Sequence, residues 1–199
     1  SNNIDEQKIS LNEQFELTEE QFLEFNETFK ECGFSEITKV EKEDTDNNGI
    51  TPFYIEMKGI EPNKIIAPGR TEGNIIYIYI SPDKKLNEIS VNYSPIYKNG
   101  KVISKVCAYT KLNVKEKTTC QIICEEQVKK LLKSPSTAQF CKYNEYKWSK
   151  ENGIILAQGY VDAQNSFGAM LRSNYMLTYN CVTQRPVSLN VDGQQYDFK

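Results

Sequence analysis

The sequence predicts an α+β protein of two small domains, each with one helix packed on an antiparallel β-sheet. Two stretches with helical periodicity, near residues 18–33 and 120–133, are each followed by short segments rich in β-branched and aromatic residues. Two-residue turn signals such as Asn99-Gly100 and Asn152-Gly153 separate several of these segments. A helix followed by a run of strands is typical of α+β folds.

The first domain is predicted to span residues 17–112, after a flexible N-terminal segment of residues 1–16. Its helix is "LTEEQFLEFNETFKECG", where Thr18 and Gln21 form a capping box and Gly33 follows the last turn. Phenylalanines at helical spacing give the helix one apolar face. An antiparallel meander is expected to follow, with strands at residues 36–43, 53–58, 74–80, 88–93 and 102–109.

The second domain is predicted to span residues 113–199 and to start with the polar linker "NVKEKTT". Its helix is expected from about residue 120 to 133, with Thr118 or Thr119 as N-cap and Pro135 as the stop signal. Strands are expected at residues 145–149, 154–162, 169–182, 187–191 and 195–198. Asp192-Gly193 signals a further hairpin turn.

Histidine is absent from the 199 residues. This excludes Ser-His-Asp and Cys-His catalysis and every zinc site that needs an imidazole. Residues 1–112 hold 13 basic and 19 acidic side chains, whereas residues 113–199 hold 11 and 8. Neither part has the dense basic stripe of a nucleic-acid-binding protein, so we expect no nucleic-acid partner. No apolar run approaches the roughly 20 residues of a spanning helix, so we expect membrane attachment only through a removed N-terminal anchor.

The stretch "DTDNNGITPFYIE", residues 44–56, at first has the look of a calcium loop. Counted from Asp44, however, the twelfth position is Ile55, where an EF-hand loop needs its bidentate Glu. The flanking segments are predicted strands, so we expect a turn at Asn48-Gly49, with Asp side chains that cap local amides. A weak cation site of another kind is the alternative. We predict no metal site and no cofactor.

Six cysteines are present: Cys32, Cys107, Cys120, Cys124, Cys141 and Cys181. They are expected to form disulfides in an oxidising compartment or to be buried thiols in a reducing one. Our hypothesis pairs Cys32 with Cys107, and it expects bridges from the second helix to Cys141 and Cys181. A Cys₄ zinc site would lack the paired C-x₂-C knuckles. A catalytic thiol would lack an imidazole to generate the thiolate.

The most distinctive sequence segments are "VKKLLKSPSTAQF", residues 128–140, and "GYVDAQNSFGAMLRSNY", residues 159–175. They resemble a module of uncharacterised Gram-positive bacterial proteins, many of them predicted lipoproteins or membrane-anchored surface proteins. In the first domain, "FKECGFSEI" and "YKNGKVISKV" resemble a segment that often precedes this module. Cys141 is a departure, because such proteins often carry Pro there. The resemblance implies a location at the cell surface and an architecture, and it implies no activity.

The second motif contains a candidate binding edge. We expect residues 161–171 to form two strands joined by a polar turn, with Arg172 paired to Asp162 across the hairpin and Phe167 folded back onto the sheet. As a ligand-recognition edge, it would use Asp162, Gln164, Asn165, Phe167 and Arg172. As a structural corner, the same polar groups would only satisfy one another, since Asx turns are routine in β structure.

Tyrosines are abundant in the predicted strands of the first domain. They are Tyr77, Tyr79, Tyr93, Tyr97 and Tyr109. In a two-faced sheet some of them must face outward, and exposed tyrosines favour surfaces that bind proteins or glycans. For any one of them, the simpler interpretation is a ring at the edge of the core with its hydroxyl in solvent.

These observations predict a non-catalytic, extracytoplasmic binding or assembly module at a Gram-positive cell surface, with an unknown protein or cell-envelope component as partner. The first alternative is a hydrolase of cell-envelope glycans that uses two carboxylates, with Glu56, Glu145 and Asp162 as candidate acids. The second alternative is an inhibitor or immunity-type protein, which would need a large apolar patch on one sheet face.

Overall fold

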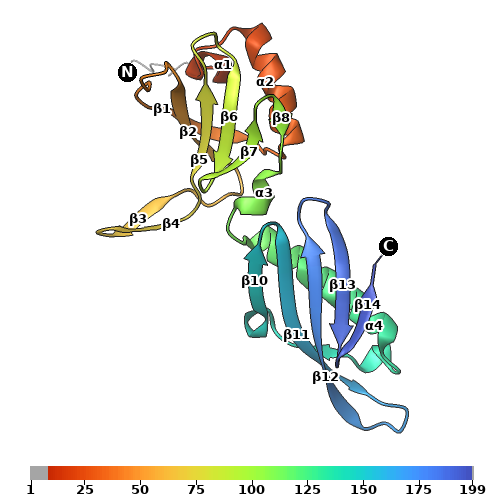
Figure 1. The fold of residues 1–199 in the computed structure, drawn as a ribbon. Coiled ribbons are helices and arrows are strands. Elements are labelled where there is room, and N and C mark those ends of the chain that lie inside the picture. The colour runs from red at the N-terminus through yellow and green to blue at the C-terminus, as the bar shows by residue number, and fades with distance from the viewer. Residues whose placement is uncertain (1–8, 199) are drawn as a thin grey trace, which may run out of the picture. The chain divides into compact units, whose positions relative to one another are not determined.

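The computed structural model describes residues 9–198, so part of the predicted flexible N-terminal segment, residues 1–8, lies outside the described residues. The chain divides into two compact units, residues 1–110 and 111–199. The predicted boundary between residues 112 and 113 lies close to this division. Both units are mixed α and β structures built on mostly antiparallel sheets (Figure 1). Each unit is described separately below.

The first unit contains a main sheet with the strand order β1-β2-β5-β6-β7-β8. The strands β3 and β4 form a separate two-stranded sheet. The elements are α1 (Leu11–Gln14), α2 (Glu19–Glu31), β1 (Ile37–Lys42), β2 (Thr51–Met57), β3 (Lys64–Ala67), β4 (Arg70–Glu72), β5 (Ile76–Ile80), β6 (Leu86–Val91), β7 (Ser94–Lys98), β8 (Lys101–Val102) and α3 (Val106–Tyr109).

The first predicted helix is confirmed as α2. The Thr18 hydroxyl accepts a hydrogen bond from the Gln21 N–H at 3.2 Å, and the Gln21 side chain accepts one from the Thr18 N–H at 2.9 Å. This reciprocal pair is the predicted capping box. Phe25 and Phe29 on the apolar face of α2 belong to the same buried cluster as the inward residues of β2, β5 and β6.

The prediction of a flexible segment up to residue 16 is wrong for the described part of that segment. Residues 11–14 form α1, and Phe15 is fully buried in the core. The Phe15 ring lies 5.3 Å from the Phe53 ring of β2, centroid to centroid, in an edge-on arrangement. The apolar burial of Phe15 therefore holds this segment against the sheet.

The strand predicted at residues 102–109 is also wrong. Only β8 is extended there, and residues 106–109 form the short helix α3. The β-branched and aromatic composition that suggested a strand instead supplies core contacts, because Val106 and Ala108 are buried. The strand β7 and the β3–β4 hairpin were not among the predicted strands.

The calcium-like stretch is a turn between β1 and β2, as predicted. The Asp46 Oδ1 atom accepts hydrogen bonds from the N–H groups of Asn48 and Ile50, both at 2.8 Å. Gly49 follows with a φ of 78°, which glycine adopts without strain.

The second unit contains one long helix and a larger sheet with the strand order β10-β11-β12-β13-β14, and β9 also pairs with β11. The elements are α4 (Val114–Leu131), η1 (Pro135–Thr137), β9 (Gln139–Phe140), η2 (Tyr143–Glu145), β10 (Lys147–Glu151), β11 (Ile154–Gln164), β12 (Met170–Asn180), β13 (Arg185–Val191) and β14 (Gln194–Asp197). α4 contacts β11, β12 and β13.

The start of α4 differs from the prediction. The helix begins at Val114, and Asn113 is its N-cap, because the Asn113 side chain accepts a hydrogen bond from the Glu116 N–H at 2.9 Å. The predicted cap Thr118 lies inside the helix, where its hydroxyl donates to the Val114 carbonyl. The stretch predicted to be a polar linker is therefore the first turn and a half of a helix.

The predicted two-residue turns at Asn99-Gly100, Asn152-Gly153 and Asp192-Gly193 are confirmed. All six residues have positive φ values, which the mirror-image turns of tight hairpins require. The five strands predicted in the second domain correspond to β10 to β14, with shifted ends.

The cysteines differ from the predicted pairing. Cys32, Cys120, Cys124 and Cys141 are free and buried, whereas Cys107 and Cys181 are disulfide-bonded. The predicted Cys32–Cys107 pair and the bridges from the helix are therefore wrong. Cys120 and Cys124 both point inward from α4, because both are fully buried. An inward direction fills the core without placing a second cysteine at bonding geometry.

Candidate functional site

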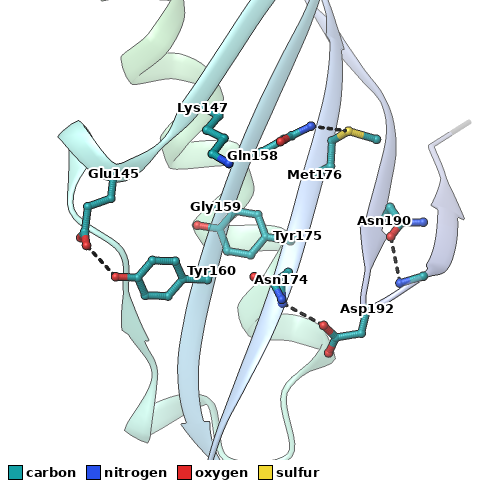
Figure 2. Close-up of a pocket in the computed structure, with 11 residues that line it drawn as sticks. Glu145, Lys147, Gln158, Gly159, Tyr160, Asn174, Tyr175, Met176, Asn190 and Asp192 are labelled. Atoms are coloured by element: carbon teal, nitrogen blue, oxygen red, sulfur yellow. Dashed lines mark hydrogen bonds between the residues drawn. The ribbon is translucent and has the colours of Figure 1, made fainter.

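An open pocket of about 620 Å³ lies on one face of the sheet in the second unit. Successive residues of a strand point to opposite faces. In β11, Ile155, Ala157 and Val161 are buried on the inner face, whereas Gln158 and Tyr160 point outward into the pocket. The lining residues are Glu145, Lys147, Gln158, Gly159, Tyr160, Asn174, Tyr175, Met176, Asn190, Asp192 and Gly193 (Figure 2).

One side of the pocket is built from a linked set of aromatic and charged groups. The Tyr160 hydroxyl donates to the Glu145 Oε1 atom at 2.7 Å. The Arg172 guanidinium lies 3.8 Å from the centre of the Tyr160 ring, a cation–π distance. Arg172 also makes a bidentate pair with Asp162, with Nε–Oδ1 and Nη2–Oδ2 distances of 2.8 and 2.7 Å. The set fixes the orientation of the Tyr160 ring at the edge of the pocket.

These contacts keep the carboxylates of this set ionised. The hydrogen bond from Tyr160 and a second from the Lys142 N–H lower the pKa of Glu145. The hydrogen bonds from Arg172 lower the pKa of Asp162. A lowered pKa is the opposite of what a carboxylic acid that donates a proton near neutral pH requires.

The other side of the pocket carries side-chain amides. The Asn174 N–H donates to Asp192 Oδ1 at 2.8 Å, and Asn190 Oδ1 accepts from the Gly193 N–H at 3.0 Å. Gln158 Nε2 contacts the Met176 sulfur at 3.4 Å. The Asp192 side chain engages only the backbone N–H of Asn174. Within residues 9–198, no hydrogen bond or ion pair engages the side-chain amide of Asn174, the Asn190 Nδ2 atom or the Lys147 ammonium. These donors are therefore open to a ligand.

The floor of the pocket is closely packed. Gly159 lies in the middle of β11 above two buried side chains, Tyr175 and Cys141. The Tyr175 hydroxyl bonds the Tyr146 hydroxyl at 2.6 Å and lies 3.8 Å from the Cys141 sulfur. Burial is the largest reason for the raised pKa of both tyrosines, so both stay neutral under the pocket.

The structure brings together some of the five predicted binding residues. The Asp162–Arg172 pair across the hairpin is confirmed. Asn165 Oδ1 accepts from the N–H groups of Phe167 and Ala169, which makes the predicted polar turn. The Gln164 N–H donates to the Thr137 hydroxyl at 2.9 Å. Phe167 is 94% exposed, so the prediction that it folds back onto the sheet is wrong.

None of these five residues lines the pocket, which lies next to them through Tyr160. Of the predicted candidates, only Glu145 lines it, and it had been considered as a catalytic acid. The amides and Tyr160 were missed, although a signal exists in the sequence. Gln158 and Tyr160 are two residues apart in one predicted strand, and Asn174 and Met176 are two residues apart in the next, so each pair lies on one face of its strand.

The three candidate acids do not form one site. Glu56 belongs to the sheet of the first unit, where its carboxylate lies 3.5 Å from the Lys39 ammonium. Asp162 is engaged by Arg172, and Glu145 by Tyr160. Asp192, which was not among the candidates, shares the pocket with Glu145.

Among the five predicted tyrosines, Tyr93 is 82% exposed, in the turn between β6 and β7. Tyr97 and Tyr109 pack against the core of the first unit. Tyr77 and Tyr79 are half-buried on the sheet face with Tyr54, at ring separations of 5.9 Å. Tyr97 and Tyr109 are thus at the edge of the core, as the simpler interpretation predicts. Tyr77 and Tyr79 instead alternate with buried isoleucines of β5, so their rings lie on the outward face of the sheet.

Comparison with known proteins identifies no family for this chain. No protein-family model, curated protein or solved structure matches the chain. Within residues 9–198, no helix has the length and apolar character needed to cross a membrane.

Proposed function

We propose that the protein is a non-catalytic binding module and that the pocket of the second unit holds a polar, hydroxyl-rich ligand. The observation that carries the proposal is the group of open amide and ammonium donors that lines the pocket together with a tyrosine ring held by Glu145 and Arg172. Binding sites typically combine a preformed concave surface with a few well-placed polar groups.

The chemistry of the pocket matches a carbohydrate better than a simple anion or cation. The amides of Gln158, Asn174 and Asn190 offer donors and acceptors together. Glu145 and Asp192 add acceptors, and Lys147 adds a donor, so no single charge sign dominates. A sugar presents hydroxyl groups that both donate and accept. This supports a glycan of the cell envelope as the ligand, at a Gram-positive cell surface as the sequence resemblance implies.

A glycan hydrolase is the second candidate, because Glu145 and Asp192 line the same pocket and such enzymes use two carboxylates. One of the two would have to be a protonated acid. The lowered pKa of Glu145 does not suit that role. Asp192 is exposed and accepts a backbone hydrogen bond. The arrangement therefore favours binding over hydrolysis.

The test is a titration of the ¹⁵N-labelled protein with soluble glycan fragments from Gram-positive cell wall. We expect the side-chain amide signals of Gln158, Asn174 and Asn190 to shift, and those of Gln195 on β14 to stay. Asn174→Ala should weaken binding about fivefold, since one hydrogen bond contributes about 1 kcal/mol. Gln195→Ala is the matched control outside the pocket.

The same samples are assayed for released reducing ends. Unchanged fragments together with shifted pocket amides would support a binding module. Fragment cleavage that is abolished by Glu145→Gln would instead establish the hydrolase. Pocket amides that do not respond to any cell-wall fragment would reject the glycan proposal.

A further inference from the structure

The hairpin between β11 and β12 carries three exposed apolar side chains at its tip. Phe167 is 94% exposed, Leu171 55% and Met170 47%. Burying such side chains in water-free surroundings is favourable, so a solvent-exposed group of them indicates a contact surface. We call Phe167, Met170 and Leu171 the hairpin tip.

The hairpin tip is held in one conformation. Asn165 Oδ1 accepts from the N–H groups of Phe167 and Ala169 at 2.9 and 3.0 Å. The Gly168 N–H donates to the Asn165 carbonyl, and Gly168 has a φ of 81°. Below the turn, the bidentate Asp162–Arg172 pair ties the two strands together. Contact therefore requires little further ordering of the hairpin.

The apolar side chains point in several directions. Met170 and Leu171 are consecutive residues of β12, so their side chains point to opposite faces of the hairpin, and Phe167 lies in the turn itself. A flat protein surface would cover only one face. An apolar medium that the tip can enter, such as the edge of a lipid bilayer, buries both faces at once.

Positive charge lies at the same end of the unit. Lys129, Lys130 and Lys133, at and just beyond the end of α4, are exposed. None of the three is in an ion pair within the described part of the chain. The segment that follows them reaches the base of the hairpin, where the Thr137 hydroxyl accepts from the Gln164 N–H. Lys129 also lies 5.3 Å from the Phe140 ring, whose strand β9 pairs with β11. Figure 1 shows the end of α4 and the hairpin at one end of this unit.

Lysines near a helix C-terminus also interact favourably with the helix dipole. That local role accounts for their positions but gives no reason for an apolar hairpin beside them. An anionic membrane surface attracts lysines at the headgroups and accommodates apolar side chains beneath them, so it uses both features.

We propose that this end of the second unit docks on an anionic lipid bilayer, with the hairpin tip in the acyl boundary and Lys129, Lys130 and Lys133 at the headgroups. The proposal is independent of the pocket and its ligand. It describes attachment in the plane of the interface, without a spanning segment.

The test measures binding of the full chain to phosphatidylcholine vesicles with and without phosphatidylglycerol. We expect binding that requires the anionic lipid and weakens as salt is raised. Phe167→Ser should weaken it at least about tenfold, from the lost burial of one aromatic ring. Replacing all three lysines with Gln should weaken it about 100-fold.

The matched controls are Val187→Ser, an exposed apolar residue on β13, and Lys115→Gln, at the opposite end of α4. Both should bind vesicles like the unaltered protein. If the chain binds neither the neutral nor the anionic vesicles, the proposal is wrong. So would equal binding by Phe167→Ser and the unaltered chain, with circular dichroism used to verify the fold of every variant.

Discussion

At the scale of single residues, Gly159 shows why a glycine can be required inside a regular strand. Its backbone φ is not in the left-handed region, so backbone freedom is not the reason. A Cβ atom there would lie 2.7 Å from the Tyr175 hydroxyl and 2.9 Å from the Cys141 sulfur. Glycine in a strand often marks such a close approach. The Tyr175 side chain and the Cys141 sulfur thus occupy the space that a side chain at position 159 would need.

We therefore predict that Gly159→Ala destabilises the protein by about 1–3 kcal/mol, the usual range for overpacking a well-packed core. Urea unfolding followed by circular dichroism would measure the change. Tyr175→Phe removes the nearest atom, so the double variant should lose less than the sum of the two single changes. Strict additivity in this cycle would show that the clash is not the cause.

Single residues of the site also differ in whether their contacts can be predicted from the sequence. The Asp162–Arg172 pair was predictable, because a hairpin register follows from its turn and opposite charges favour facing positions. The direction of Phe167 was not predictable, since nothing in the local pattern says whether a turn residue contacts its own sheet. The pocket depends on five elements, and only their assembly reveals which outward residues share one surface.

At the scale of elements, the first turn of α4 is tied to the sheet by a buried ion pair. The Lys150 ammonium of β10 lies 2.7 and 3.0 Å from the two Glu116 carboxylate oxygens. The two side chains are only 4% and 13% exposed. Glu116 also accepts from the Asn113 N–H as part of the capping box. One carboxylate thus serves both the helix start and its attachment to β10.

Glu116→Gln should destabilise the protein by about 3 kcal/mol. Gln preserves the capping role at this position, but it leaves a buried ammonium without its carboxylate. Lys98→Gln is the matched control, because the Lys98–Glu88 pair is much more exposed and should contribute less than about 1 kcal/mol. The denaturant concentrations at the unfolding midpoints of the two variants would measure the two losses of stability. Equal midpoints would contradict a special role for the buried pair.

This ion pair also explains the largest error in the predicted elements of the second unit. The polar composition of residues 113–119 favoured a linker, because charge is usually a sign of solvent exposure. Here the sheet supplies Lys150 as a buried partner, and a contact between residues so distant in sequence cannot be inferred from local composition. The α2 helix and the Asn-Gly hairpins were predicted correctly because caps and two-residue turns are local.

At the scale of the whole molecule, the cysteines depart most from expectation. The even count and the resemblance to surface proteins favoured a disulfide network, yet four of the six cysteines are free and buried. Cys120 and Cys124 fill the helix stripe that faces the sheet as small apolar residues would. The spacing of cysteines in sequence does not distinguish a core thiol from a bridging one, since both point inward.

We predict how many thiols react in the unfolded protein and how fast they react in the native protein. Protein unfolded in denaturant without reductant should show four reactive thiols, because Cys107 and Cys181 are disulfide-bonded. In the native state at pH 8, alkylation by iodoacetamide should be very slow. Burial raises the pKa of Cys32 to about 11 and that of Cys120 to about 12, and the thiolate is the reactive form.

The pH dependence follows from the same physics. Raising the pH toward 11 should accelerate native-state labelling of Cys32 before that of Cys120, if the fold persists, because its raised pKa is the lower of the two. A control variant, Ser166→Cys, places a thiol on the exposed hairpin turn and should react rapidly at pH 8. Mass spectrometry of the labelled peptides identifies each site. Six reactive thiols in denaturant would show that Cys107 and Cys181 are not disulfide-bonded. Rapid native labelling of Cys120 would show that this thiol is not buried.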